Sequence, residues 1–296
     1  MPVMTSAQAE GLRVFRRGKV RDTFELDDDT LLMVATDRLS AFDVVLPTPI
    51  PDKGRVLTQM SRWWFAQTEH ISPNHLLADA PDAVPQDQRE DWLQRSMHVR
   101  RAERIDIECV VRGYISGSGW KEYRTQRTLA GEPLPAGLLE SGRLDHPRFT
   151  PAAKNDTGHD VNISRANLAD VVGTELAQRL EQVSLDLYNF AAAHCEKRGV
   201  ILADTKFEFG HIDGELTLID EIFTPDSSRF WEVAQYKEGS SVTSMDKQFV
   251  RDFLETLSWD KTPPGPELPP DVVAGTRQRY LEAAHRICDL ELGLLG

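Results

Sequence analysis

Two segments, ADTKFEFG (residues 203–210) and LIDE (residues 218–221), carry ionisable side chains where a buried strand would carry apolar ones. Side chains alternate between the two faces of a strand, so every second residue shares a face. One face of the first segment therefore carries Asp204, Lys206 and Glu208, and the other carries Thr205 and two phenylalanines. The first face is suited to chemistry and the second to packing in a core.

The residues between these segments predict a β-hairpin, because Asp213-Gly214 is a strong turn signal. A two-residue turn would place Glu208 opposite Ile219. A three-residue loop would place Glu208 opposite Asp220, on the same face. We favour the three-residue loop.

Two carboxylates that face each other across a ladder repel, and a divalent cation between them would remove that repulsion. Magnesium is usually held by one or two carboxylates together with substrate phosphates. Lys206 lies on the same face and can act as a counter-charge for phosphate. The hairpin therefore predicts an ATP·Mg²⁺ site that contains Glu208 and Asp220. The alternative is a solvated hairpin face whose charges only keep the protein soluble.

The composition limits the classes of partner. The chain has 296 residues, with 34 Lys plus Arg, 47 Asp plus Glu and a net charge of −13. This charge argues against a nucleic-acid groove or an anionic membrane surface. The three cysteines are far apart and lack metal-ligand spacing, which is typical of reduced thiols in a cytoplasmic protein. Residues 1–10 do not resemble a signal peptide, and no apolar run approaches the roughly 20 residues of a membrane span.

Hydrophobic patterning predicts a β-rich start over residues 14–51 and a helix over 53–70. Strand-like alternation returns over 97–112. A long amphipathic helix is expected over 174–198 and a last helix over about 271–290.

Three local signals complete this pattern. Ser164 can cap a short helix, and TSMD (residues 243–246) has capping-box spacing. Residues 125–160 are rich in glycine, proline and polar side chains, which predicts a long ordered insertion or a partly mobile lid.

The fold class expected is α+β, with nucleotide bound between two lobes. Residues 1–105 are expected to form a β-rich lobe that covers ATP. Residues 106–296 are expected to form a mixed α/β lobe that carries the substrate and metal sites.

Two N-terminal segments gather charged side chains. In GKVRD (residues 18–22), Lys19 and Arg21 lie two apart on one face, as in a flap over nucleotide phosphates, although basic residues also protect strand edges. The GxxxxGK[ST] pattern of a Walker loop is absent. TDRLSAFD (residues 36–43) follows an apolar strand and is typical of a ligand-binding loop, or of a turn held by its own side chains.

Two arginine-containing segments predict anion binding. VVRGYISGSG (residues 110–119) couples Arg112 to a Gly/Ser loop whose amides and hydroxyls can surround a phosphate, or which is a flexible connector. DSSRFW (residues 226–231) offers Arg229 beside two hydroxyls. No HExxH, GxSxG or Cys/His arrangement indicates zinc or a covalent enzyme intermediate.

Seven blocks, in order between about Gly18 and Phe253, resemble the SAICAR synthetase family of purine biosynthesis. They are GKVRDTF, TDRLSAFD, ECVVRGYISGSGW, KNDTGHDVNIS, LADTKFEFG, LIDEIFTPDSSRFW and SMDKQFVRDF. The resemblance implies an ATP-dependent ligase that joins carboxyaminoimidazole ribonucleotide to L-aspartate and cleaves ATP to ADP and phosphate. It also implies a fold similar to the ATP-binding lobes of kinases and ATP-grasp enzymes.

The resemblance also implies roles for the matching residues. The ATP contacts are Lys19, Val20, Arg21 and Lys206, and the catalytic set is Lys206 with the two magnesium ligands Glu208 and Asp220. The ribonucleotide contacts are Arg112, Ser118 and Arg229, with Asp37, Ser40 and Asp43 nearby. Further substrate contacts fall on Lys154, Asp160 and Lys247. Aspartate is expected beside the ribonucleotide loop and Lys154 or Lys247, where bases outweigh the acidic background.

The implied chemistry needs no enzyme nucleophile. A carboxylate is a poor electrophile, so ATP would first convert it to an acyl phosphate that the amine of aspartate then attacks. The enzyme would act by positioning and charge neutralisation.

Two rival classes share parts of this pattern. A small-molecule kinase would need a base such as the Asp of an HRD loop, which the chain lacks. A non-catalytic nucleotide-binding module would have lost the metal carboxylates, and both are present. The long insertion and C-terminus resemble the longer, often monomeric form of the family, with a homodimer as the alternative.

Overall fold

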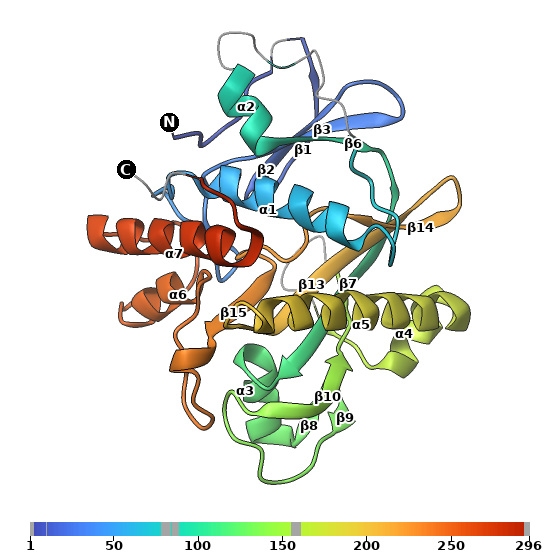
Figure 1. Cartoon of the computed structure of the whole chain (residues 1–296), viewed down its shortest axis with the longest axis vertical. Helices are drawn as coiled ribbons and strands as arrows, with labels where there is room; N and C mark the ends of the chain where they lie inside the picture. Colours follow the sequence, from blue (N-terminus) through green and yellow to red (C-terminus); the bar gives the residue numbers. More distant parts are fainter. Residues whose placement is uncertain (1–2, 10, 78–83, 85–88, 155–160, 293–296) are drawn as a thin grey trace.

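The computed structural model describes residues 3–9, 11–77, 84, 89–154 and 161–292. Its fold is α+β, with a β-rich N-terminal part at one end and three long helices, α1, α5 and α7, that cross the middle (Figure 1). None of the described helices is long and apolar enough to cross a membrane.

The N-terminal part contains a four-stranded antiparallel sheet in the order β1-β2-β3-β6. Its strands are β1 (Arg13–Arg17), β2 (Arg21–Glu25), β3 (Thr30–Ala35) and β6 (Ser96–Arg100). The expectation that Lys19 and Arg21 share a strand face is wrong. The amide of Gly18 donates to the carbonyl of Arg21 at 2.7 Å and closes a turn, so Lys19 lies in the loop between β1 and β2.

Short elements and two helices accompany this sheet. They are β4 (Ser40–Ala41), β5 (Val44–Val45), α1 (Lys53–Thr68) and α2 (Arg89–Arg95). The predicted helix over 53–70 is confirmed, and it fully buries Trp64 against the main core.

A seven-stranded sheet forms the centre of the second part, in the order β12-β11-β7-β13-β14, with β10 also paired to β7 and β15 to β13. Its strands are β7 (Glu103–Tyr114), β10 (Arg143–Phe149), β11 (Ala152–Ala153), β12 (Val161–Asn162), β13 (Val200–Ile212), β14 (Glu215–Ile219) and β15 (Ser228–Glu232). Around it lie α3 (Gly117–Gln126), α4 (Arg165–Val172), α5 (Thr174–Glu196), a 3-10 turn (Val233–Gln235), α6 (Gln248–Glu255) and α7 (Pro270–Cys288).

The predicted alternation along β13 is confirmed. Phe207 and Phe209 are fully buried in the core with the apolar side of α5. The opposite face of the strand carries Asp204, Lys206 and Glu208, and each of them contacts charged groups from other segments. Burial of the aromatic face thus fixes where the charged face lies.

The predicted three-residue loop of the hairpin is wrong. Ile212 pairs with Glu215 and Glu208 pairs with Ile219, which leaves a two-residue turn at Asp213-Gly214. Both turn residues have positive φ, 53° and 79°, as a two-residue hairpin turn requires. The twist of the strands therefore selects the shorter turn.

The insertion is ordered where it is described. After α3 the chain forms a two-stranded sheet of β8 (Thr128–Leu129) and β9 (Glu132–Pro133), then β10 and β11. Ser164 caps α4 by accepting from the amide of Asn167 at 3.1 Å, as predicted. The capping box over 243–246 is wrong, because α6 begins only at Gln248 and Lys247 is its N-cap without a side-chain cap.

Candidate active site

The charged face of β13 is the centre of a network of ion pairs. Lys206 Nζ lies 2.5 Å from Glu108 of β7 and 3.7 Å from Glu208. Lys154 Nζ lies 2.6 Å from Glu208 on the other side. Glu108 and Glu208 are direct partners in the ladder between β7 and β13, so two carboxylates and two amines alternate across it. Glu108 was not predicted, although it lies four residues before Arg112 and hence on the same face of β7.

Asp220 reaches this network from the end of β14. Its φ of 69° turns the chain out of the strand, and its carboxylate lies 2.7 Å from Arg21 of β2. Arg21 also lies 3.1 Å from Glu221. The predicted pair of Glu208 and Asp220 is therefore not a cross-strand pair, but their charges still act on each other. Arg21 thus joins the two sheets at the predicted magnesium site.

The two carboxylates have opposite pKa shifts. Burial favours the neutral form of Glu208, but Lys206 and Lys154 outweigh it and lower the pKa of Glu208 to about 2. Burial raises the pKa of Asp220 to about 6, with Arg21 opposing and Glu208 adding to the rise. Glu208 is therefore fully ionised at neutral pH, while Asp220 is the more easily protonated of the two.

Glu208 and Asp220 fit a magnesium ion whose remaining ligands are phosphate oxygens. Carboxylate oxygens are the ligands that Mg²⁺ prefers, and one or two suffice when phosphates complete the shell. Among the described residues, no group of three or more His, Cys, Asp or Glu side chains could hold a metal alone. The carboxylates of Glu208 and Asp220 are balanced by Lys154 and Arg21, so an incoming cation would have to replace these contacts.

A second cluster lies at the other end of the same face of β13. Arg112 Nη1 and Arg229 Nη1 both contact Asp204 Oδ2, at 2.9 and 3.2 Å. Arg112 also donates to Ser118 at 3.3 Å, and Arg229 donates to Ser116, the N-cap of α3. Two guanidinium groups, one carboxylate and a helix N-terminus leave an excess of positive charge, which suits a phosphate. The structure brings together the predicted Arg112, Ser118 and Arg229.

A glycine makes this cluster possible. Gly117 has φ of +55°, and a Cβ atom there would lie 2.8 Å from Arg229 Nη2. Only glycine therefore lets the start of α3 approach the guanidinium without a clash.

The first acid of the loop at 36–43, Asp37, has a structural role in this conformation. Asp37 is fully buried and accepts from the amides of Met4 (2.8 Å) and Gly54 (3.0 Å) and from Arg95 (3.2 Å). Asp37 therefore positions the start of α1 through Gly54, and its predicted place near the ribonucleotide stays a prediction. Burial of this kind is not visible in the sequence.

The other two residues of this loop remain accessible. Asp43, with φ of 64°, is exposed and ion-pairs with Lys19. Ser40 is half-buried in the β4–β5 hairpin. The predicted Asp160 lies outside the described residues.

Lys247 lies beside a third group of charges. Lys53 Nζ and the hydroxyl of Tyr280 each contact Asp226, both at 2.7 Å. Burial lowers the pKa of Lys247 to about 8; Asp226 opposes this shift, and Arg251, Lys206 and Lys53 reinforce it. Lys247 therefore interacts electrostatically with Lys206 on the β13 face and with Asp226.

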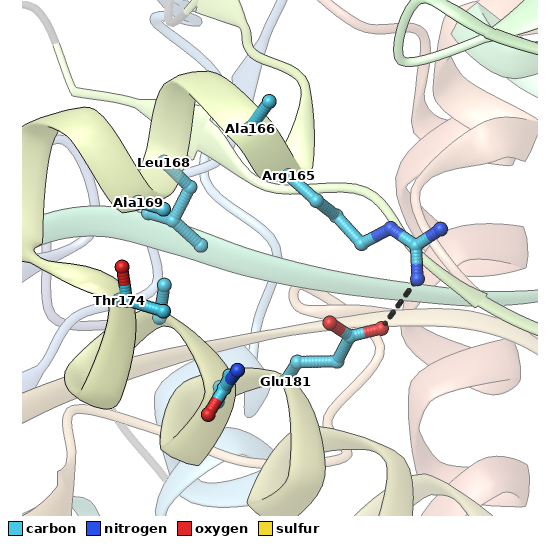
Figure 2. A pocket seen from close by; sticks show the side chains of 8 residues that line it. Arg165, Ala166, Leu168, Ala169, Thr174 and Glu181 are labelled. Atoms are coloured by element: carbon cyan, nitrogen blue, oxygen red, sulfur yellow. Dashed lines mark hydrogen bonds and ion pairs between the residues drawn. The ribbon is translucent and has the colours of Figure 1, made fainter.

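One pocket lies elsewhere, between α4 and α5. It has a volume of about 290 Å³ and contains none of the predicted site residues. Figure 2 shows the side chain of Arg165, at the start of α4, pointing to Glu181 of α5, with which it pairs at 3.0 Å. This pocket therefore does not coincide with the charged groups, which form ion pairs with one another around β13.

Comparison with known proteins gives one family throughout. The SAICAR synthetase family model matches residues 14–266. The phosphoribosylaminoimidazole-succinocarboxamide synthase of Methylobacillus flagellatus is 50% identical over 290 residues, which cover 97% of each chain. The SAICAR synthase of Saccharomyces cerevisiae, solved in complex with SAICAR, has a TM-score of 0.88 and 40% identity, covering 98% of this chain and 99% of that one. A SAICAR synthetase solved in complex with ADP has a TM-score of 0.67 and 26% identity, covering 93% and 97%.

Proposed function

Because this chain belongs to the SAICAR synthetase family, we propose that the β13 face holds Mg²⁺·ATP at one end and the ribonucleotide phosphate at the other. The chain is an ATP-dependent ligase of purine biosynthesis that joins carboxyaminoimidazole ribonucleotide to L-aspartate. The proposal concerns which residues perform each part of this reaction.

One observation carries the assignment. Asp204, which gathers Arg112 and Arg229, lies four residues before Glu208 on the same face of one strand. Four residues of strand span about 13 Å, which is on the scale of a mononucleotide. A ribonucleotide whose phosphate lies at the arginines can therefore extend its base toward Lys206 and Glu208.

In the proposed reaction, a carboxylate oxygen of the ribonucleotide attacks the γ-phosphorus of ATP, and ADP leaves. The amine of aspartate then attacks the carbonyl carbon of the acyl phosphate; inorganic phosphate leaves and the nitrogen loses a proton. Lys206 and Arg21 would neutralise transferring phosphate oxygens, with Lys19 and Val20 in the loop above them. Magnesium held by Glu208 and Asp220 would supply further charge neutralisation.

The division into lobes is also a proposal, with residues 1–105 covering ATP and residues 106–296 carrying the other sites. The two sheets support it, because the first ends with β6 at Arg100 and the second begins with β7 at Glu103. Residues 73–77 would couple the lobes. His75 donates its amide to Leu218 of β14 (3.1 Å) and accepts from Arg100 of β6 (2.8 Å).

We further propose a monomer in the cytoplasm. The longer form of the family and the three buried, free cysteines support this proposal. Sedimentation of the purified protein tests the monomer, because a homodimer would sediment with twice the mass.

The test of the reaction is ADP release in a coupled assay with the carboxylated ribonucleotide, with and without L-aspartate. We expect full turnover only with both substrates and SAICAR as the product. Equal ADP release without aspartate, or no release at all, would contradict the proposed step order or the function itself.

A further inference from the structure

The guanidinium of Arg38 lies against the loop between β1 and β2. It donates to the carbonyl of Gly18 at 2.9 Å and to the carbonyl of Lys19 at 3.1 Å. It also donates to the two carboxylate oxygens of Asp22, at 2.9 and 3.2 Å, and to the carbonyl of Thr5 at 2.7 Å. A guanidinium has five N–H donors, so these bonds use all of them. Arg38 therefore acts within the protein, and the β1–β2 loop is one of the segments that it holds.

The carboxylate that holds Arg38 is itself fixed. Asp22 is fully buried on β2, lies 2.8 Å from Arg17 of β1 and accepts from the amide of Ala7 at 2.9 Å. Two guanidinium groups thus balance one buried carboxylate, which is how a buried charge is tolerated. The side chain of Arg38 is only 16% exposed. Because the guanidinium has one fixed place, it can fix the β1–β2 loop in turn.

A second residue next to Arg38 in the sequence holds the following carbonyl of the loop. Thr36 donates to the carbonyl of Val20 twice, from its amide at 2.9 Å and from its hydroxyl at 2.6 Å. Together with the two carbonyls that Arg38 holds, three consecutive carbonyls of the loop accept from one short segment of the chain. The side chain of Lys19 also ion-pairs with Asp43. The loop at 36–43 therefore supports the β1–β2 loop along its whole length.

The direction of these carbonyls determines the direction of the loop amides. The β1–β2 loop contains no cis peptide bond, and in a trans peptide the carbonyl and the following amide point in opposite directions. The amides of Lys19 and Val20 therefore point away from Arg38. Neither amide donates to another group within the described residues. Two successive N–H groups that point away from the same support can bind an anion such as phosphate.

We propose that Arg38 is a positioning residue for phosphate transfer, because it holds the β1–β2 loop with the amides of Lys19 and Val20 facing the phosphates of ATP. This inference rests on the proposed function, which places these two residues above the phosphates. In this role Arg38 acts through the loop and does not contact the nucleotide. Only the fraction of molecules with a competent loop can bind ATP fully, so an ordered loop gives a higher affinity. Without Arg38, ATP binding would have to order the loop.

The test is steady-state kinetics of Arg38→Met and Arg38→Lys. Methionine removes every donor, whereas lysine keeps a charge for Asp22 but lacks the planar fork that reaches two carbonyls at once. If the loop is then competent about a tenth of the time, the KM for Mg²⁺·ATP should rise about tenfold in both variants. The KM values for the ribonucleotide and aspartate should stay within about twofold. Arg55→Met is the matched control, because Arg55 is 12% exposed and pairs with Asp52 at 2.8 Å instead of with the loop.

Melting curves separate positioning from folding. Arg38→Met leaves the buried Asp22 with one guanidinium fewer, so its Tm should fall. Arg38→Lys should melt closer to the wild type and still show the raised KM for Mg²⁺·ATP. A purely structural role predicts that turnover follows the folded fraction while this KM stays unchanged. A wild-type KM for Mg²⁺·ATP in Arg38→Lys and Arg38→Met, or an equal rise in all three KM values, would overturn the inference.

Lys19→Met distinguishes a failure of this inference from a failure of the proposed function. If the wild type makes no SAICAR, the proposed function fails. If Lys19→Met raises the KM for Mg²⁺·ATP and neither Arg38 variant does, only this inference fails. A wild-type KM for Mg²⁺·ATP in Lys19→Met would overturn the placement of ATP below the β1–β2 loop, and this inference with it.

Discussion

Arg21 of β2 lies 2.7 Å from Asp220, 199 residues further along the chain, and this ion pair connects the two sheets at the predicted magnesium site. The guanidinium is only slightly exposed and also contacts Glu221. Burial disfavours the charged guanidinium, but Asp220 and Glu221 more than compensate, so the pKa of Arg21 is raised. A protein cation thus neutralises a carboxylate that Mg²⁺·ATP would require, and the carboxylates do not simply repel each other in the free protein.

The first prediction contrasts these two carboxylates. The folded pKa of Glu208 is lowered from 4.5 to about 2, so its stabilisation is present above pH 4.5 and is lost as the pH falls toward 2. The folded pKa of Asp220 is raised from 3.8 to about 6, so its ionisation costs stability as the pH rises through that window. At pH 7.5 we therefore expect Glu208→Gln to lower Tm by a few degrees, about 2–4 °C for each kcal/mol lost, and Asp220→Asn to leave Tm unchanged or raise it.

Both variants should lose ATP-dependent turnover by on the order of 10²-fold, the scale of removing one preorganised electrostatic contact. Melting curves and ADP release measure the two effects, with Asp145→Asn as an exposed control. Variants that melt lower yet turn over normally would show that the pair is structural. Equal melting shifts for Glu208→Gln and Asp220→Asn would contradict the opposite pKa shifts.

Local rules predicted the charged face but not all of its partners. Alternation along β13 places Lys206 and Glu208 correctly, because it depends only on the period of a strand. The register was wrong because the positive φ of Asp213 and Gly214 favours the short turn. Asp220 still reaches the site because its own backbone is left-handed, with φ of 69°. No sequence pattern used here predicts that conformation.

Other residues depend on pairing between distant segments. Glu108 becomes a site residue only because β7 lies beside β13, a pairing that alternation within one strand does not specify. The burial of Asp37 and its hydrogen bond to the amide of Gly54 likewise depend on how the loop at 36–43 packs against the start of α1.

The second prediction concerns the ribonucleotide phosphate. Arg112→Ala and Arg229→Ala should each weaken ribonucleotide binding at least about tenfold, because each removes a charge-assisted contact worth roughly 1.5–3 kcal/mol. ATP binding should change less. Arg165→Ala is the matched control, since Arg165 is ion-paired with Glu132 and Glu181 beside the distant pocket. Calorimetric titration that gives wild-type affinity for both test variants would remove the phosphate assignment.

The third prediction uses the close approach at Gly117. In Gly117→Ala the new Cβ would lie 2.8 Å from Arg229 Nη2, and the φ of +55° would be strained. The guanidinium or the start of α3 must move, so ribonucleotide affinity should fall while the KM for Mg²⁺·ATP stays close to wild type. Gly137→Ala is the control, because its backbone is also left-handed but nothing lies within 4 Å of its Cβ position. A similar loss of affinity in both variants would show that backbone strain, and not the contact with Arg229, is responsible.

The last prediction uses pH to test whether the aspartate acceptor lies beside Lys247, one of the two lysines that the sequence predicts for it. The pKa of Lys247 is lowered to about 8, so its amine is charged below that value and loses its proton as the pH rises above it. Succinate is fully ionised over this range and has no amine, so its inhibition reports only on the site. In the wild type the inhibition constant should rise above pH 8, approaching tenfold per pH unit when one proton is required. Lys247→Arg keeps its charge, because the pKa of arginine exceeds 12, so its inhibition constant should be nearly flat between about pH 7 and 9.5. Circular dichroism at each pH verifies that both proteins stay folded. If both proteins show the same slope, Lys247 does not bind the diacid through its charge, and the acceptor must be held elsewhere.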